Sequence, residues 1–268
     1  MRSRHRALIL GIVVLVAAAA GARWLWAYNS GSGRVVTGLG GCDATVYPPP
    51  TSSTTGAPST TTTTPSSSTS LTSNTSTTSS TEVLHEGDQG PAVMALQRRL
   101  SDLGYWLGDI DGRYGSSTVH AVIAFQKAQG MARDGTAGPA TVDALSRAPR
   151  PQPRSHSGRL IEIDLSRQLL LVVADGRVDW AMDACTGARP GSTPIGVFHV
   201  FRQVDGYDRS PLGVLYRPKY FNNGVAVHGY PVVPPRPASH GCVRVTNAEM
   251  DWLWSQNAMP VGTEVRVY

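Results

Sequence analysis

Residues 237–245 read PASHGCVRV, and they place Cys242 between a His-Gly pair and a Val-Arg pair. The chain has only three cysteines, an odd number that argues against a disulfide framework. A second His-Gly pair, His228-Gly229, lies fourteen residues before Cys242. A thiol of ordinary pKa, about 8.5, is a poor nucleophile at neutral pH, so a reactive cysteine needs a base within reach. The stretch therefore raises the hypothesis of a nucleophilic cysteine served by a histidine.

The residue types around Cys242 fit this hypothesis. His228 is expected at the end of an adjacent strand and is the better base, because His240 is only two residues from the cysteine. The backbone N–H groups of Gly241 and Cys242 are expected to face a developing oxyanion, and Arg244 is expected to hold a substrate carboxylate. Two other interpretations remain open: a core cysteine without chemistry, and a zinc site formed by the two histidines and the cysteine.

The first 28 residues predict export. A basic start, MRSRHR, precedes the apolar run Ala7–Ala22, which suits either a cleaved signal peptide or a signal anchor. Trp24, Trp26 and Tyr28 follow and suit the membrane–water interface, which favours the anchor. Either way, the remaining chain is expected outside the cytoplasm, in the wall or a periplasm-like space. Cys42 follows Leu-Gly-Gly as in a lipobox, but it lies too far beyond the apolar run to favour lipidation.

Residues 29–83 predict a disordered Ser/Thr/Pro-rich linker. Between Thr51 and Thr81, 25 of 31 residues are Ser or Thr, so the segment has almost nothing apolar to bury. The net charge of +5 and the pI near 9.3 are mildly basic, but the sequence has no dense Lys/Arg block. Nucleic acid is therefore not an expected partner.

The rest of the chain predicts a multidomain protein, with a small all-α three-helix domain followed by a mainly-β domain. Within 84–146, helices are expected from Pro91, over roughly 117–129, and after Pro139. Asp-Gly turns followed by a glycine and a threonine occur twice there at one spacing, which indicates an internal repeat. Residues 147–157 are a Pro-rich, semi-rigid linker.

Residues 158–268 are long enough for a single core and have a β-rich pattern. Short alternating apolar runs separated by turn residues predict several strands, arranged as a sandwich or a barrel-like sheet. NAEMDWLWSQN is the one good helix candidate, with Asn247 expected as its N-cap.

The segment 84–146 resembles the peptidoglycan-binding three-helix domain. The match rests on the pattern GxVxxLQxxLxxxGY…DGxxGxxTxxAVxxFQ, which begins at Pro91-Ala92-Val93 and ends at Phe125-Gln126. It departs at its first position, where Pro91-Ala92 precede the valine. The resemblance implies wall binding, but it does not indicate which side chains contact glycan.

The segment 158–268 resembles the L,D-transpeptidase (YkuD-like) family. Its His-Gly followed by SHGCVR fits, as do CTGARPGSTPIGVFHV and the closing GTEVRVY. The resemblance implies that Cys242 is the nucleophile, that His228 is the proton acceptor, and that a backbone carbonyl near Gly229 orients the imidazole. Ser239, His240, Gly241 and Arg244 would shape the pocket and meet the substrate. Two departures are a short, Pro-rich segment between His228 and Cys242, and Cys185 at a position where serine is usual.

What the resemblance implies is a two-step acyl transfer between peptidoglycan stem peptides. A cysteine thioester forms with release of terminal D-Ala, an amine of a second stem resolves it, and no metal or organic cofactor is needed. The family's sensitivity to carbapenem-type β-lactams is implied as well.

Expected partners are stem peptides, glycan and, through the N-terminal segment, the cytoplasmic membrane. An L,D-carboxypeptidase that uses water and a non-catalytic wall-binding protein remain alternatives. Sortases and NlpC-type peptidases fit less well, because their cysteine and histidine are arranged differently along the chain.

Overall fold

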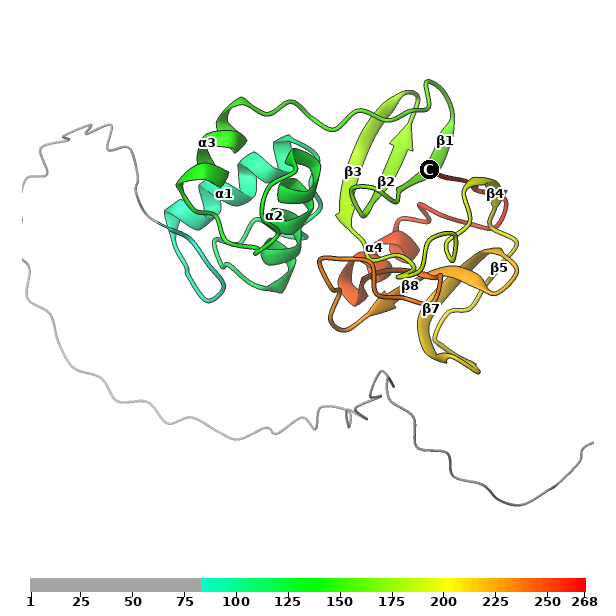
Figure 1. Cartoon of the computed structure of the whole chain (residues 1–268). Coiled ribbons are helices and arrows are strands. Elements are labelled where there is room, and N and C mark those ends of the chain that lie inside the picture. Colours follow the sequence, from blue (N-terminus) through cyan, green and yellow to red (C-terminus); the bar gives the residue numbers. More distant parts are fainter. Residues whose placement is uncertain (1–82) are drawn as a thin grey trace, which may run out of the picture. The chain divides into compact units, whose positions relative to one another are not determined.

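The computed structural model describes residues 83–268, which belong to one compact unit (Figure 1). The expected anchor or signal peptide over 1–28 lies outside the described residues, as do Cys42 and the Ser/Thr/Pro-rich linker apart from its last residue. Between residues 83 and 268, no helix combines the length and apolar character that a membrane crossing requires.

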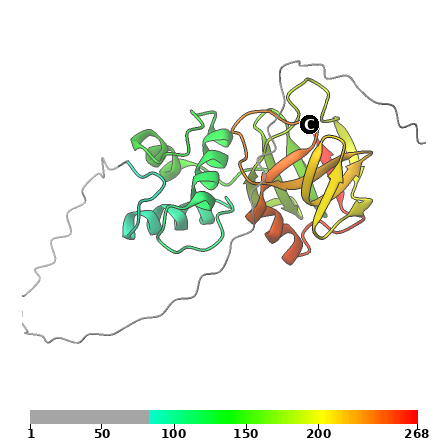
Figure 2. The same ribbon diagram turned by 90° about the horizontal axis from the view of Figure 1, so that it is seen from below.

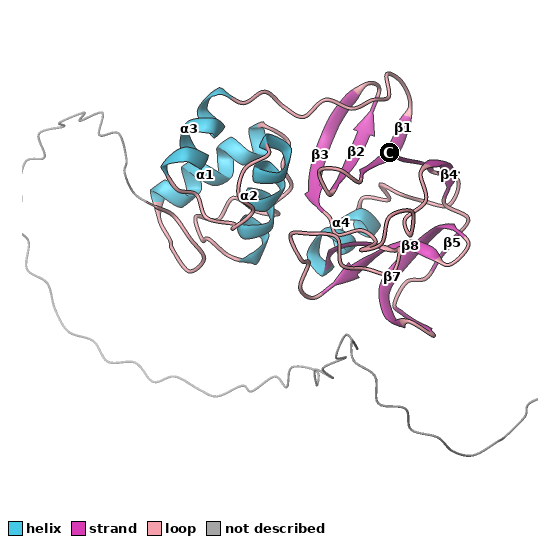
Figure 3. Cartoon of the chain, viewed as in Figure 1, coloured by secondary structure: helices cyan, strands magenta, loops and turns pink. Residues whose placement is uncertain are grey.

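Three helices form the N-terminal part of the described chain (Figure 3). They are α1 (Pro91–Asp102), α2 (Ser116–Gln129) and α3 (Pro139–Arg147). Each begins directly after a glycine, and α1 and α3 carry a proline in their first turn, where its missing N–H costs nothing. The three helices expected from the sequence are thus confirmed, and α2 starts one residue earlier than predicted.

The internal repeat has a physical basis in two buried glutamines. Gln97 donates to Oδ1 of Asp111 at 2.9 Å and accepts from the amide of Gly112 at 2.8 Å. Gln126 makes the equivalent bonds one repeat later, to Asp134 at 2.7 Å and from Gly135 at 3.0 Å. Both glycines have a positive φ, near 70°, so each turn requires glycine. One side chain therefore fixes each Asp-Gly turn against the preceding helix.

The C-terminal part is mainly β, as predicted, and holds two five-stranded groups and one helix (Figure 2). The first sheet has, in spatial order, the strands β3 (Arg177–Asp183), β2 (Leu169–Ala174), β1 (Arg159–Asp164), β10 (Glu264–Val267) and β4 (Gly196–His199). The second has, in spatial order, the strands β5 (Arg202–Gln203), β7 (Gly213–Asn222), β8 (Val225–Tyr230) and β9 (Val243–Thr246). Strand β6 (Tyr207–Ser210) also pairs with β7. The pairs β1–β10 and β8–β9 are parallel, and the other pairs are antiparallel.

A single apolar core joins both sheets to helix α4 (Asn247–Ser255). It includes Ile161 of β1, Val227 of β8, Val243 of β9 and Met250 of α4, none of which is exposed. Strands β8 and β9 pair side by side, and β9 is the last strand of the second sheet. These two strands carry the residues discussed below.

The prediction that Asn247 is the N-cap of α4 is wrong, because the N-cap is Thr246. Thr246 has an extended backbone, and its hydroxyl accepts from the amide of Glu249 at 3.1 Å. The carboxylate of Glu249 in turn accepts from the amide of Thr246 at 2.7 Å, which completes a capping box. Threonine with glutamate three residues later therefore sets the helix start one residue before the asparagine.

The helices pack directly on the first sheet. Tyr105 and Phe125 share one apolar cluster with Leu169 of β2 and Val178 of β3. The amide of Ala181 also donates to the carbonyl of Gly104 at 2.7 Å. The helical and β parts are thus continuous through a common core.

The Pro-rich segment between α3 and β1 is attached to the β part rather than free. Arg150 donates to the carbonyl oxygens of Val178 and Asp179 at 3.1 and 3.0 Å. The amides of Arg154 and Ser155 donate to the buried carboxylate of Glu162 at 2.9 and 2.7 Å. Hydrogen bonds thus hold the connection along its length.

Candidate active site

Cys242 lies at the start of β9, where it is partly exposed. Its side chain packs beside Leu215, Tyr220 and Ala226, and its Sγ lies 3.7 Å from the carbonyl oxygen of Gly224. Burial raises the pKa of the thiol, although the backbone of Ala226 and the charge of Arg244 act in the other direction. The resting thiol is therefore protonated at neutral pH and needs a base to react.

His228 lies on β8 and shares a sheet face with Cys242. In the parallel register, Val227 pairs with Val243, and both valines point into the core. Since successive side chains of a strand point to opposite faces, His228 and Cys242 both lie on the other face. The structure thus brings the two residues that the sequence singled out onto one surface of the sheet.

The hydrogen bond of the His228 imidazole determines its tautomer. Nδ1 lies 2.9 Å from the carbonyl oxygen of Gly229, and a carbonyl oxygen accepts only, so Nδ1 carries the hydrogen. Nε2 is then the free proton acceptor. Burial lowers the pKa of His228 to about 4, and the charge of Arg244 contributes, while the bond to Gly229 opposes both. At neutral pH the ring is therefore a neutral base.

The loop before Cys242 is fixed by side-chain bonds to its own backbone. The hydroxyl of Ser239 donates to the carbonyl of Cys242 at 2.6 Å and accepts from the amide of Gly241 at 3.0 Å. The hydroxyl of Thr193 donates to the carbonyl of Gly241 at 2.7 Å. Gly241 has a φ of +148°, and a Cβ there would lie 2.6 Å from the carbonyl oxygen of Ser192. Only glycine fits at this position.

This loop alters the expected oxyanion donors. The amide of Gly241 is already bonded to Ser239, so it is committed to the loop. The amide of Cys242 has no backbone partner among residues 83–268. Of the two N–H groups named from the sequence, only that of Cys242 is available to a developing oxyanion.

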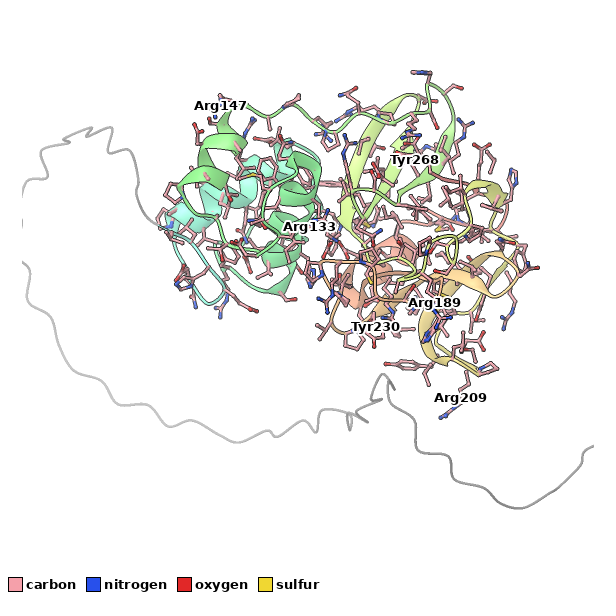
Figure 4. The ribbon with its side chains drawn as sticks, viewed as in Figure 1. Arg133, Arg147, Arg189, Arg209, Tyr230 and Tyr268 are labelled. Carbon is pink, nitrogen blue, oxygen red and sulfur yellow. The ribbon has the colours of Figure 1, made fainter. Side chains whose placement is uncertain are left out.

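Arg244 is directed by Tyr230, which the sequence analysis missed. The guanidinium lies over the Tyr230 ring, 4.1 Å from its centroid, and Nη1 lies 3.5 Å from the carbonyl oxygen of Ala238 (Figure 4 labels Tyr230). The Nε atom of Arg244 is buried and has no hydrogen-bond partner among the described residues. The sequence does contain a signal for Tyr230: side chains two residues apart on a strand share a face, so Tyr230 lies on the same face of β8 as His228.

The other named residues divide between surface and interior. His240 is exposed, and its side chain makes no hydrogen bond or ion pair with another described residue. Cys185 is fully buried, and its backbone exchanges two hydrogen bonds with Arg244, each 2.9 Å. A second thiol thus lies beside the strand that carries the site.

Over residues 83–268, no three His, Cys, Asp or Glu side chains come together as metal ligands, so the zinc site considered above is not assembled.

Comparisons with known proteins match both parts of the described chain. Residues 158–267 match the family model of the L,D-transpeptidase catalytic domain, YkuD, and residues 89–145 match that of a putative peptidoglycan binding domain. The crystal structure of an L,D-transpeptidase from Xylanimonas cellulosilytica, covering its residues 123–326, is 49% identical to the chain. The similarity covers 70% of this chain and 98% of that one, with a TM-score of 0.67.

The curated amidases that the chain matches are similar to its helical part only. The N-acetylmuramoyl-L-alanine amidase CwlM of Mycobacterium tuberculosis is 43% identical over 56 residues, which are 21% of this chain and 14% of that protein. The zinc D-Ala-D-Ala carboxypeptidase of Streptomyces albus G is 46% identical over 65 residues, 23% of this chain and 25% of that protein. The chain thus spans a quarter or less of the length of these relatives.

Proposed function

The chain belongs to the YkuD family of L,D-transpeptidases, and we propose that it cross-links peptidoglycan stem peptides through a thioester on Cys242. The observation that carries the proposal is the shared sheet face of Cys242 and His228, together with the bond that leaves Nε2 of His228 free. A neutral, oriented imidazole beside a protonated thiol is the arrangement that general-base activation requires.

In the first step, Sγ of Cys242 attacks the carbonyl carbon of the third stem residue while Nε2 of His228 takes the thiol proton. The oxyanion that forms is met by the amide of Cys242, which is free of other bonds within residues 83–268. Collapse of this intermediate breaks the peptide bond, and His228 returns its proton to the departing amine of D-Ala. The product is a thioester and free D-Ala.

In the second step, the amine of a neighbouring stem attacks the thioester. His228 accepts a proton from that amine, a new amide bond forms, and the sulfur leaves and is reprotonated. Water in place of the amine would give an L,D-carboxypeptidase by the same route. The partly exposed position of Cys242, directly before the first residue of β9, suits access by a second, bulky stem.

Substrate contacts are proposed for the residues around the thiol. Arg244, held flat by Tyr230, has donors left for a stem carboxylate. His240 is exposed beside Cys242 and is proposed to line the entrance. Ser239 is proposed to act through the loop, because its hydroxyl already donates to the Cys242 carbonyl.

Wall binding by the helical part and a location outside the cytoplasm follow from the same two domains. We propose further that the segment 1–28 either anchors the chain in the membrane or is removed after export. The long linker would then let the folded part reach the wall.

The test is turnover of a disaccharide-tetrapeptide by the full chain, followed by mass spectrometry, beside Cys242→Ala and His228→Ala. A dimer lacking one D-Ala, absent with both variants, is the expected result. Tripeptide monomer alone would assign the carboxypeptidase instead. An unchanged substrate, with no thioester on the wild-type chain, would refute the enzymatic proposal.

A further inference from the structure

Lys127 belongs to α2 of the helical part, yet its ammonium is buried in the β part. The side chains of Lys127 and Asp183 are both fully buried and form an ion pair. Nζ also donates to the carbonyl oxygens of Ala184 at 2.7 Å and Gln168 at 3.2 Å. An ammonium has three hydrogens, so all three donors are used within the β part. Burying this charge is costly unless it is fully paired, as it is here.

One of these bonds begins a continuous path to the nucleophile. Gln168, whose carbonyl accepts from Lys127, donates its side-chain amide to Oγ1 of Thr186 at 2.7 Å and accepts from the Thr186 amide at 2.8 Å. The carbonyl of Thr186 accepts from the amide of Ser239 at 3.0 Å. The Ser239 hydroxyl then holds the carbonyl of Cys242. The bonds from Lys127 to Gln168 and between Gln168 and Thr186 are buried.

A second branch leads to the arginine of the site. Lys127 binds the side chain of Asp183 and the backbone of Ala184, and the next residue, Cys185, exchanges two backbone bonds with Arg244. Nearby, Arg133 of the helical part donates to the carbonyl of Pro235 at 3.1 Å, in the segment that leads to Ser239 (Figure 4 labels Arg133). The helical part therefore touches the supports of both Cys242 and Arg244.

We propose that Lys127 is a positioning residue for the acyl-transfer site, so that helix α2 is part of the support of the nucleophile as well as of the wall-binding domain. The inference rests on the proposed transpeptidase function. A chain of hydrogen bonds that ends on the reacting residue helps to fix its geometry, and a displacement of about 1 Å can cost up to about a hundredfold in rate. Without the ammonium, Asp183, Ala184 and Gln168 each lose one hydrogen bond from α2, and Asp183 keeps its bond to His120 of that helix.

The experiment compares Lys127→Met with Gln126→Met in the full chain. Gln126 is the adjacent residue of the same helix, it is equally buried, and it makes a similar number of hydrogen bonds, but only within the helical part. For each variant we would measure the melting temperature, kcat and KM with disaccharide-tetrapeptide, and the rate of iodoacetamide alkylation at Cys242, resolved by peptide mass spectrometry. Thr186→Val, which removes the bond from the Gln168 side chain to the Thr186 hydroxyl and so weakens the path outside the helix, is the third variant.

With Lys127→Met, we expect kcat to fall by about ten- to a hundredfold, with KM changed by no more than about twofold. The alkylation rate of Cys242 should change as well, and Thr186→Val should shift both quantities in the same direction. Gln126→Met should lower the melting temperature but leave kcat and the alkylation rate as in the wild type. If Lys127→Met does not fold, the comparison of Thr186→Val with Gln126→Met decides.

A positioning role is excluded if Lys127→Met or Thr186→Val changes only the melting temperature, or if Gln126→Met impairs the site to the same degree. The alkylation rate does not depend on the substrate. If the wild-type chain had no transpeptidase activity, the proposed function would therefore fail while the alkylation comparison still tested Lys127.

Discussion

His228 on β8 lies directly opposite Arg244 on β9 in the parallel register. The guanidinium disfavours a second positive charge on the imidazole, and burial disfavours it more, so the pKa of His228 falls to about 4. A histidine that starts neutral receives the thiol proton only as the reaction proceeds. These shifts favour the proposed general-base activation over a resting thiolate–imidazolium pair.

The pH dependence of activity should follow from this pairing. His228 is active when neutral, so kcat/KM is expected to be lost as pH falls through about 4, with no inflection near the ordinary histidine pKa of about 6.5. A profile of kcat/KM between pH 3.5 and 8 measures it. An acid limb centred near 6.5 would show instead that the imidazole is exposed to water in solution.

Replacing His228 should lower the rate of acyl transfer without blocking access of reagents to the Cys242 thiol. For His228→Gln, we expect kcat to fall by about 10²- to 10⁴-fold, because glutamine cannot accept the proton. Iodoacetamide should still alkylate Cys242, which remains partly exposed. Steady-state kinetics and peptide mass spectrometry give the two readouts. A variant with near wild-type kcat would remove His228 from the mechanism.

A carbapenem should acylate one thiol of the described chain. We expect an adduct on Cys242 in the intact mass, which Cys242→Ala abolishes completely and Cys185→Ala retains. Cys185 is fully buried, and burial raises the pKa of its thiol, so it should stay unmodified. An adduct that survives in Cys242→Ala would identify a different nucleophile.

Stability should depend on pH through Glu249. Complete burial raises the pKa of this carboxyl to about 7; Asp183 adds to the shift, and His120 opposes it. The folded state therefore binds the extra proton, and its stabilising contribution, full below the ordinary pKa of about 4.5, is lost as pH rises through 7. Glu249→Gln keeps the capping box without the charge. Relative to the wild type, it should gain about 1–3 kcal/mol of unfolding free energy between pH 4.5 and pH 8.

Urea unfolding at the two pH values provides the measurement, with Thr246→Ala as a control. Loss of that cap should cost about 1 kcal/mol at pH 4.5 and more at pH 8, because the Thr246 hydroxyl helps to stabilise the charged form of Glu249. If Glu249→Gln and the wild type had parallel pH profiles, the carboxyl would have an ordinary pKa in the folded protein.

Local patterns predicted the elements because each depends on neighbours in sequence. Pro91, Pro139 and the glycines before them give the helix starts, and the spacing of His228, Cys242 and Arg244 indicates the site. The N-cap of α4 was missed although its signal is local, because Asn247 was preferred to the threonine–glutamate pair that begins one residue earlier.

Lys127 and Tyr230 were not predicted for a different reason. A lysine on an amphipathic helix is expected at the surface, and nothing nearby in sequence announces Asp183, 56 residues away. Tyr230 acts only through a guanidinium on a neighbouring strand. Contacts of this kind depend on how the helical and β parts pack, which residue spacing does not encode.

Lys127 and Lys219 are the only lysines in the chain, and each is 1% exposed. Nζ of Lys219 is bonded to Gln203 at 2.9 Å and lies 3.8 Å from the centroid of the Trp254 ring. An enzyme that transfers acyl groups to amines is thereby left with no accessible ε-amine over residues 83–268. A lysine of another copy is therefore not accessible to the thioester proposed on Cys242.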